Sequence, residues 1–529
     1  MENAGKMLKS WVVRRYSVSF QDVLDNFAME GDATTKWQVL FLACMILVGT
    51  FYAFDAPAAL NIPLMEYLGI GYDEWQFKLN LLYSAYSLPN TIIPFISGGY
   101  IASYGVSTVL LTVSSLVIVG QVIFSFGLSL KSYPLLLLGR IIFGIGGESV
   151  SVCQSCIVAL WFGSSSQISF ALGLTVSIAR FGSALNSICS PRIERALGVQ
   201  TAIWTATILC LLSFICSIVL VWITAKRETG YVRIGGTDND SVERPLIRSR
   251  SPSVLLLSRS SSISIRSGTS ESMISDTQTI LTTVNSLRKE FWMICLLCIL
   301  LYGTIIPFNN TASDFLMEKW YHNDTVTAGN VMAIPESIST FMVPFSGYYI
   351  DAYGHKVLLL LACSILVTLV HLVLGLIEGS SPVLPMCVLG ISYSVYGAAI
   401  WGAIADVSRP RLSEPDSGSG TDFTKLEESA SKSLGAAYGL STSLYNGSLV
   451  VLPLIAAEIR VQSGGFLWVE MFFAFLGFLG ILSSILLYYM DNANGGILEE
   501  GSVVSSRIRR SDDTIDSEAS NSNASTLYE

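Results

Sequence analysis

Charged residues are scarce in this 529-residue chain: Asp, Glu, Lys and Arg make up 13% of it, about half the share of soluble domains. Hydrophobic residues make up 51%, and the mean hydropathy is +0.55. These values exclude a soluble globular protein and predict an all-α membrane protein with many spans. The formal net charge of -9 is spread over tails and loops, so it indicates no nucleic-acid partner.

Accessible cysteines and cofactor motifs are also lacking. All ten cysteines lie in apolar stretches, including the pairs Cys153/Cys156 and Cys295/Cys298. Metal and redox sites need accessible thiols in electropositive surroundings, so we expect no metal site and no disulfide framework. The sequence contains no P-loop and no cofactor fingerprint, so we expect that the protein binds no cofactor and is not an enzyme. The first thirty-five residues are polar and lack the apolar core of a cleavable signal peptide.

Long hydrophobic runs are abundant. Twelve of them are long enough to cross a bilayer as helices. They cover residues 38–59, 79–101, 108–128, 133–160, 168–189 and 201–224, then 291–308, 327–350, 357–377, 383–405, 434–456 and 466–490. A polar segment between the sixth and seventh runs divides them six plus six, so we predict two bundles of six helices each.

The division predicts five segments: an N-terminal tail (1–36), a bundle (37–225), a linker (226–289), a second bundle (290–490) with a loop insertion at 406–433, and a C-terminal tail (491–529). The linker is rich in arginine, which places it in the cytosol by the positive-inside rule. Its arginines include Arg244, Arg248, Arg250, Arg259 and Arg266. An even number of helices on each side then places both tails in the cytosol.

Two N-x-[ST] sequons, at Asn309 and Asn323, follow the seventh run. The predicted topology puts this loop on the non-cytosolic side, where glycans are attached, so we predict a glycan on each. Asn446 and Asn523 also fit the sequon. One lies in a membrane run and the other in a cytosolic tail, so we expect neither to be glycosylated.

Two charges interrupt the fourth and fifth runs. Glu148 follows glycines at 144, 146 and 147, and Arg180 is the only formal charge between Gln167 and Asn186. A charge at mid-membrane costs about 2.5 to 3.5 kcal/mol on insertion scales, so both side chains should face protein or water. We interpret them as the two ends of a site for a small zwitterion. The alternative is a structural ion pair that sets helix register and closes a gate without touching substrate.

A glycine-rich segment recurs after the second helix of each half. In the second half it runs from Gly347 to Lys356 and includes Asp351; in the first half Ala102 and Ser103 replace the acid and base. Recurrence at matching places of two six-helix halves resembles the signature of the major facilitator superfamily. That resemblance implies the major facilitator fold. It also implies that Asp351 and Lys356 help to close an inner gate.

Four further segments resemble the lysosomal dipeptide transporter family of that superfamily: residues 54–60, 143–149, 177–183 and 438–440. The resemblance implies a carrier that moves dipeptides from the lysosome lumen to the cytosol. It further implies that an acid on helix four and an arginine on helix five hold the peptide termini, and Glu148 and Arg180 stand at those positions. The family also implies a single-span, glycosylated accessory subunit.

An extended dipeptide separates its ammonium and carboxylate by roughly 7 Å, so a fixed acid and a fixed arginine can bracket it. The planar fork of Arg180 suits the carboxylate. Nearby polar and aromatic residues either add contacts or only pack between helices: Tyr83, Tyr86, Asn90, Asn186, Trp401, Tyr438 and Tyr445. The first helix lacks the E-x-x-E-[RK] pattern of proton-coupled peptide transporters, which favours a uniporter.

Two more acids lie inside runs. Asp55 is near the non-cytosolic end of the first helix, so we predict a gate or helix-cap role, with proton binding as the alternative. Glu336 follows Pro335, and the sequence assigns it no role.

Two short cytosolic segments resemble lysosomal sorting signals. Tyr231 to Ile234 has the Y-x-x-Φ form just beyond the sixth helix, and Leu246-Ile247 resembles an acidic dileucine signal. The alternative for both is a plain disordered linker. With the family resemblance they predict a multi-pass protein of the lysosomal membrane. Two other functions stay open: a carrier of a sugar or organic anion, and a sensor or scaffold that does not transport.

Overall fold

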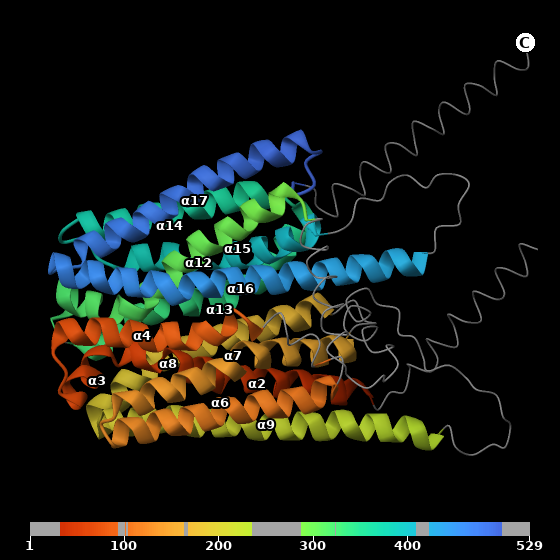
Figure 1. Ribbon diagram of the computed structural model, residues 1–529, viewed down its shortest axis with the longest axis horizontal. Helices are drawn as coiled ribbons and strands as arrows, with labels where there is room; N and C mark the ends of the chain where they lie inside the picture. Colours follow the sequence, from red (N-terminus) through yellow and green to blue (C-terminus); the bar gives the residue numbers. More distant parts are fainter. Residues whose placement is uncertain are drawn as a thin grey trace, which may run out of the picture.

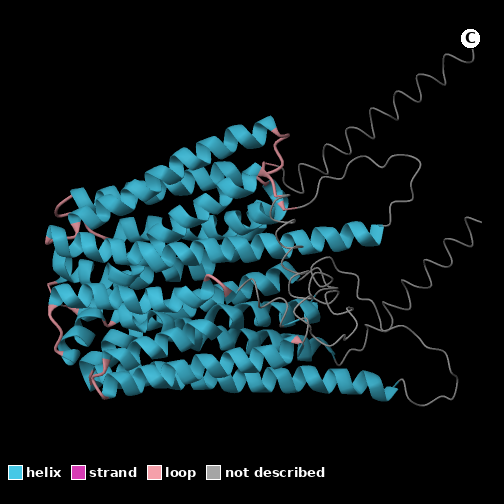
Figure 2. Ribbon diagram, viewed as in Figure 1, coloured by secondary structure: helices cyan, strands magenta, loops and turns pink. Residues whose placement is uncertain are grey.

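The computed structural model describes residues 32–93, 101, 104–162, 168–234, 287–322, 324–408 and 423–499. These residues are almost entirely helical and form no strand. The long helices lie side by side in one bundle (Figure 1), and short loops join many of them (Figure 2). The all-α architecture predicted from the sequence is confirmed for the described residues.

The first half of the bundle contains α2 (Asp32–Ala59), α3 (Asn61–Leu68), α4 (Tyr72–Asn90), α6 (Val106–Ser129), α7 (Tyr133–Phe162), α8 (Ile168–Leu197) and α9 (Val199–Ile234). The second half contains α12 (Lys289–Leu316), η2 (Met317–Tyr321), α13 (Thr325–Tyr353), α14 (Lys356–Leu376), α15 (Val383–Val407), α16 (Phe423–Ser463) and α17 (Leu467–Ala493). We call the end that carries α3 and η2 the loop end. The opposite end, where α2 begins and α9 ends, is the tail end.

Ten of the described helices are long and apolar enough to cross a membrane. Helices α4 and α13, which match the second and eighth runs, fall outside that set because they are richer in polar residues or proline. Both pack across the division between the halves, α4 against α16 and α13 against α8. Their polar residues are therefore accommodated inside the bundle and not on its lipid-facing surface.

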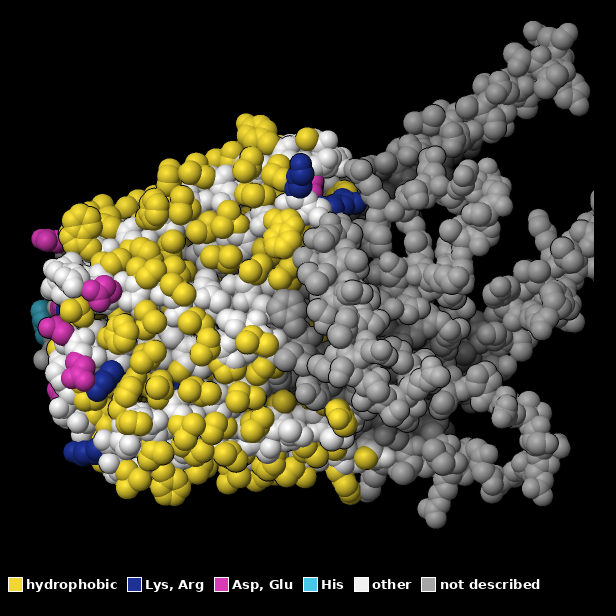
Figure 3. All heavy atoms as spheres, viewed as in Figure 1, with side chains coloured by type: hydrophobic (Ala, Val, Ile, Leu, Met, Phe, Trp, Pro, Cys, Tyr) yellow, Lys and Arg dark blue, Asp and Glu magenta, His cyan; other side chains and the backbone are white. Residues whose placement is uncertain are grey.

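The outer surface of the bundle is apolar. Helix α9 exposes Ile208, Leu212, Ile215 and Trp222 along its length. In the face shown in Figure 3, hydrophobic side chains cover the middle of the bundle, and charged side chains gather near its ends. A hydrophobic band with charged rims is what a bilayer requires of a protein that crosses it.

Helices α6 and α7 pack backbone to backbone. A Cβ added at Gly120 would lie 2.4 Å from the backbone nitrogen of Phe143, and one at Gly139 would lie 2.7 Å from that of Phe124. Only glycine permits so close an approach at these two positions. Small residues at helix contacts are a common means of association in membranes, where water drives no hydrophobic collapse between helices.

Three helix ends differ from the predicted boundaries. Helix α9 continues to Ile234, beyond the expected end of the first bundle at 225, and α16 begins at Phe423, inside the expected loop insertion at 406–433. Helix α17 ends at Ala493, three residues later than expected. Hydropathy marks the part of a helix that lies in lipid, whereas polar helix formers continue the helix into water.

The two signature segments form similar turns. Gly105 after the second helix of the first half has φ +80°, and Gly354 at the matching place of the second half has φ +77°. Positive φ favours glycine, which accounts for a glycine at both positions.

Candidate functional site

Glu148 and Arg180 lie on neighbouring helices of the first half, α7 and α8, and both are half-buried. Each meets a different partner in the second half. Arg180 Nη1 lies 3.6 Å from Glu336 Oε2 of α13. Tyr445 of α16 lies beside Glu148, and the charge of Arg180 also acts on this carboxylate. The two predicted site residues therefore face the division between the halves.

The guanidinium of Arg180 is held mainly by the second half. Besides Glu336, the ring of Tyr393 on α15 lies with its centroid 4.0 Å from the guanidinium carbon, close enough for a cation–π contact. Neither Glu336 nor Tyr393 was assigned a role from the sequence. Glu336 carried one signal, since an acid inside an apolar run needs a partner, but the sequence does not say which helix supplies it.

Helix α2 is interrupted near its loop end by Pro57. Proline has no N–H, so the carbonyl of Ala53, four residues earlier, lacks its usual helical donor. Arg140 of α7 donates to that carbonyl at 3.5 Å and to the carbonyl of Phe54 at 2.6 Å. The N–H of Ala58 donates instead to the hydroxyl of Tyr83 at 2.9 Å. Side chains from α4 and α7 thus replace the hydrogen bonds that α2 cannot make.

Arg140 is almost fully buried, with 1% of its surface exposed. Its guanidinium carbon lies within 5.1 to 5.8 Å of four ring centroids, those of Phe54, Tyr83, Phe124 and Phe143. This aromatic cage offers cation–π stabilisation to a charge that lies deep in the bundle. The sequence analysis did not identify this role, because the acceptors are backbone carbonyls that leave no trace in the sequence.

Asp55 lies inside the interrupted part of α2 and not at its end, so it does not cap the helix. Its carboxylate accepts a hydrogen bond at 3.4 Å from the side-chain amide of Asn309 on α12, and Ser183 of α8 lies beside it. The charges of Arg180, Glu336 and Arg140 act on it as well. Asp55 thus connects α2 to α12 across the halves, and its role as a gate residue stays a prediction.

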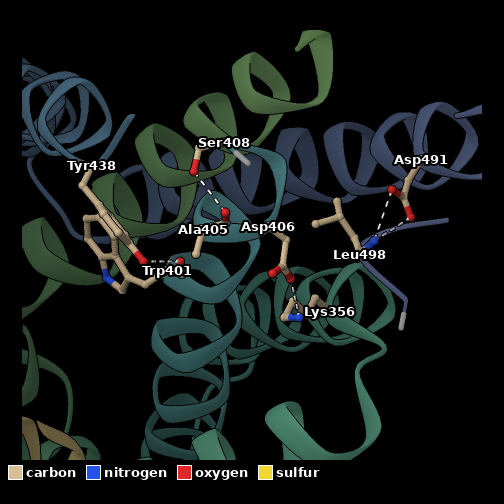
Figure 4. Close-up of polar contacts among 8 residues, drawn as sticks. All are labelled: Lys356, Trp401, Ala405, Asp406, Ser408, Tyr438, Asp491 and Leu498. Carbon is tan, nitrogen blue, oxygen red and sulfur yellow. Dashed lines mark hydrogen bonds and ion pairs between the residues drawn. The ribbon is translucent and has the colours of Figure 1, made fainter. Parts of the chain in front are cut away.

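Tyr302 of α12 gathers the predicted aromatic residues of the second half. Its hydroxyl accepts a hydrogen bond from the indole of Trp401 at 3.0 Å, and its ring lies 5.1 Å from that of Tyr445. Tyr438 packs on Trp401 and donates to its backbone carbonyl at 3.1 Å, as Figure 4 shows. Three of the predicted residues therefore form one aromatic wall, centred on a tyrosine that the sequence analysis missed.

The glycines beside Glu148 make room for a protein side chain. A Cβ at Gly147 would lie 2.5 Å from the hydroxyl oxygen of Tyr86, and one at Gly144 would lie 2.3 Å from the Tyr86 carbonyl oxygen. Tyr86 of α4 is buried and lies within range of the Glu148 charge. The close approach of α4 to α7 therefore brings Tyr86 to the acid.

Asn90 and Asn186 are fully buried and bonded within their own helices. Asn90 donates to the carbonyl of Tyr86 at 3.1 Å, and Asn186 accepts from Ser190 at 2.5 Å. The hydroxyl oxygens of Ser190 and Tyr52 lie 3.0 Å apart, a contact that ties α8 to α2. Asn90 Oδ1 and Asn186 Nδ2 have no hydrogen-bond partner among the described residues, so a role in binding stays a prediction for both.

Lys356, the basic residue of the second signature segment, joins two helices of its own half. Lys356 is buried and its ammonium lies 2.6 Å from the carboxylate of Asp406 on α15 (Figure 4), so it fastens α14 to α15 within one half. Asp351 is exposed at the end of α13, where the charges of Lys356 and Asp406 reach it. The role of Asp351 and Lys356 in closing an inner gate stays a prediction.

The segment after α17 packs on the same turn. Leu498 is fully buried, and its N–H approaches the carboxylate of Asp491 at 3.3 Å (Figure 4). The N–H groups of His355 and Lys356 donate to the carbonyls of Glu499 and Leu498, and the His355 ring meets Glu499 at 3.1 Å. The beginning of the predicted C-terminal tail is therefore part of the folded bundle.

A polar network joins the halves at the loop end. Asp314 of α12 accepts hydrogen bonds from Tyr72 at 2.6 Å and from Gln76 at 2.7 Å, both on α4. Arg460 of α16 donates to the Tyr72 hydroxyl at 3.1 Å and pairs with Glu318. These charges lie at the edges of hydrophobic runs, where the sequence does not distinguish them from loop charges.

A second contact between the halves lies nearby. Arg195 at the end of α8 is 3.7 Å from Asp324, which caps the start of α13 by accepting from the N–H of Val326. The hydroxyl of Thr327 also donates to this carboxylate and lowers the pKa of Asp324 below its usual value. Asp324 therefore stays ionised in a mildly acidic medium, and it keeps the cap.

The structure describes some of the predicted glycosylation and sorting residues and not others. Asn309 lies inside α12 and bonds to Asp55, so it is not in a loop, and the basis for a glycan there is lost. The seventh hydrophobic run was taken to end at 308 because polar residues follow, although α12 continues through them. Tyr231 and Ile234 belong to the last turns of α9 and not to a segment beyond it. Asn323, Leu246 and Ile247 lie outside the described residues.

Comparison with known proteins matches this architecture. The family model described as Major Facilitator Superfamily matches residues 37–418. The chain is 27% identical over 471 residues to the protein named lysosomal dipeptide transporter MFSD1 of Bos taurus and to that of Homo sapiens. Each alignment covers 87% of this chain, with 86% of the bovine and 87% of the human protein.

A solved structure is similar as well. The crystal structure of the human organic anion transporter MFSD10 (TETRAN) aligns with a TM-score of 0.55 at 16% identity. The alignment covers 85% of this chain and 99% of that one, and at this identity it shows a common fold alone.

Proposed function

Because the chain belongs to the Major Facilitator Superfamily, and is thus a membrane transporter and not an enzyme, we propose that it carries dipeptides out of lysosomes. The proposed direction is from the lumen to the cytosol, by uniport. Support for the substrate comes from the relatives named lysosomal dipeptide transporter, which align over 87% of this chain. The single observation that carries the proposal is the arrangement of Glu148 and Arg180.

In this proposal Glu148 binds the peptide ammonium and Arg180 binds the carboxylate. Both side chains come from the first half, and both meet partners from the second half, so a ligand between them touches each half. A site at the division between the halves is what alternating access requires, because the halves rock around it. The aromatic wall around Tyr302 then offers apolar surface to variable side chains, which suits a broad range of dipeptides.

We place the tail end in the cytosol and the loop end in the lumen, following the arginine-rich linker. The polar network around Asp314 then lies on the lumenal side. Asp324 would face the acidic lumen, and its lowered pKa suits that medium. From the family resemblance we also propose that the protein binds an accessory subunit.

Uptake of a labelled dipeptide such as Ala-Ala into liposomes that contain the purified protein tests the proposal. We expect uptake with equal pH on both sides, as for a uniporter. Glu148→Gln and Arg180→Ala should each lower the uptake rate about tenfold or more, because hydrogen bonds to charged groups contribute about 1.5 to 3 kcal/mol. Glu458→Gln is the matched control, since Glu458 is exposed on α16 and bonds only to Gln462 of the same helix among the described residues.

Capped peptides assign each charge to one end of the substrate. An N-acetylated dipeptide lacks the ammonium, so the wild type should carry it poorly and Glu148→Gln should lower its uptake no further. A C-amidated dipeptide should behave in the same way with Arg180→Ala. Equal transport of capped and free peptides, or normal transport by both variants, would show that the site assignment is wrong.

A further inference from the structure

We propose that Glu336 is the internal counter-ion of Arg180, which occupies the place of the substrate carboxylate while the carrier is empty. The inference rests on the proposed function and adds a residue to it. In the structure, Arg180 Nη1 and Glu336 Oε2 lie 3.6 Å apart, with 19% and 11% of the side chains exposed. The position at Arg180 that a peptide carboxylate would take is thus held by a carboxylate of the protein.

The contact is loose enough to be exchanged. Tight charge-assisted hydrogen bonds between nitrogen and a carboxylate oxygen measure about 2.7 to 2.9 Å, so a distance of 3.6 Å leaves the guanidinium incompletely engaged. Glu336 Oε2 has no hydrogen-bond donor among the described residues. Arginine has five N–H donors in a planar fork, and a free carboxylate can bind two of them at once. A peptide carboxylate therefore binds Arg180 better than Glu336 does.

The neighbouring acids have partners of their own. Tyr445 lies beside Glu148, and Asp55 accepts a hydrogen bond from Asn309. Glu336 faces Arg180 from α13 in the opposite half, beside Tyr393 of α15. Of the three acids, Glu336 is the one whose carboxylate forms an ion pair with Arg180.

An empty carrier needs this ion pair when it reorients. The site passes through a closed state between its two open states, and a buried charge without a partner is strongly unfavourable there. In the loaded carrier the peptide carboxylate neutralises Arg180 in place of Glu336. In the empty carrier Glu336 neutralises Arg180 instead. Loss of its charge should therefore slow only the step that the empty carrier makes.

Two transport formats separate that step. Net uptake into empty liposomes requires the empty carrier to return after each cycle, whereas exchange into liposomes preloaded with unlabelled dipeptide does not. For Glu336→Gln we expect net uptake to fall about tenfold while exchange stays within about twofold of the wild type. The Kd for Ala-Ala should fall about fivefold, because Arg180 is no longer occupied by a competing carboxylate. Glu336→Asp keeps the charge and should retain more net uptake than Glu336→Gln.

Glu470→Gln is the matched control. Glu470 is also a buried acid in an ion pair, with His371 at 2.8 Å, but it joins α14 to α17 away from the division between the halves. Its ratio of net uptake to exchange should equal that of the wild type. A parallel fall of both rates in Glu336→Gln, unchanged rates, or a weaker Kd overturns the inference while the proposed function stands. A wild-type protein that shows neither net uptake nor exchange overturns both.

Discussion

Arg140 and Pro57 depend on each other at the level of single residues. The proline removes a donor from α2, and the arginine supplies donors to the carbonyls of Ala53 and Phe54. Asp55 lies in this turn of α2, near the loop end. A buried arginine with backbone acceptors does not need a carboxylate partner.

Arg140→Met keeps the length of the side chain and removes its donors. We expect a loss of about 2 to 6 kcal/mol of stability, because two buried carbonyls lose their donor at roughly 1 to 3 kcal/mol each. Thermal unfolding of the purified protein, followed by intrinsic fluorescence, measures the change. In a Pro57→Ala background the N–H of residue 57 returns to Ala53, so the same substitution should cost less. An equal loss in both backgrounds would contradict the proposed relation.

The charges of the site were predictable from the sequence, but their partners were not. Glu148 and Arg180 stand out because each is an isolated charge in an apolar run. The pairing of Arg180 with Glu336 depends on the contact of α8 with α13, which belong to different halves. Asn309 was misplaced for the same reason, since a polar residue of an interior helix looks like a loop residue to a hydropathy scan.

At the level of helices, α6 and α7 show how closely two membrane helices can pack. The contact depends on Gly120 and Gly139, where any side chain would meet the backbone of the other helix. Helix α7 carries both Arg140 and Glu148, so its distance from α6 positions two functional side chains. The sequence predicted the helices and their order well, but their ends less well, because hydropathy does not report where a helix ends in water.

Gly120→Ala should destabilise the bundle by about 1 to 3 kcal/mol, because its Cβ would lie 2.4 Å from the nitrogen of Phe143 and the two helices must move apart. Gly347→Ala is the control, since a Cβ there meets nothing within 4 Å. The control should be neutral or slightly stabilising, because alanine favours a helix over glycine. Thermal unfolding of the two variants side by side tests this, and equal unfolding temperatures would refute the role of Gly120.

At the level of the whole molecule, the two halves are joined at the loop end. Asp314 links α12 to α4, Arg460 links α16 to α4, and Arg195 lies beside Asp324. The twelve runs and their six-plus-six division predicted two halves. Which end the halves close could not be predicted, because those contacts join residues far apart in the sequence.

Asp314→Ala should open the loop end more often, since Tyr72 and Gln76 both lose their acceptor. Hydrogen–deuterium exchange of residues 72–80 and 310–321 should become faster, while the far end of the bundle keeps its protection. Glu74→Ala is the control, because Glu74 pairs only with Lys78 of its own helix among the described residues and its side chain is 62% exposed. Unchanged exchange in Asp314→Ala would show that this network does not hold the end closed.

Helix α16 is much longer than the bilayer is thick. Its 41 residues span about 60 Å, against a hydrocarbon layer of about 30 Å, and in Figure 1 it projects past the bundle at the tail end. The projecting part is a helical extension of the second half. A tilt of about 10° displaces a tip 30 Å away by about 5 Å. A small rotation of the second half therefore produces a larger displacement at the projecting end of α16.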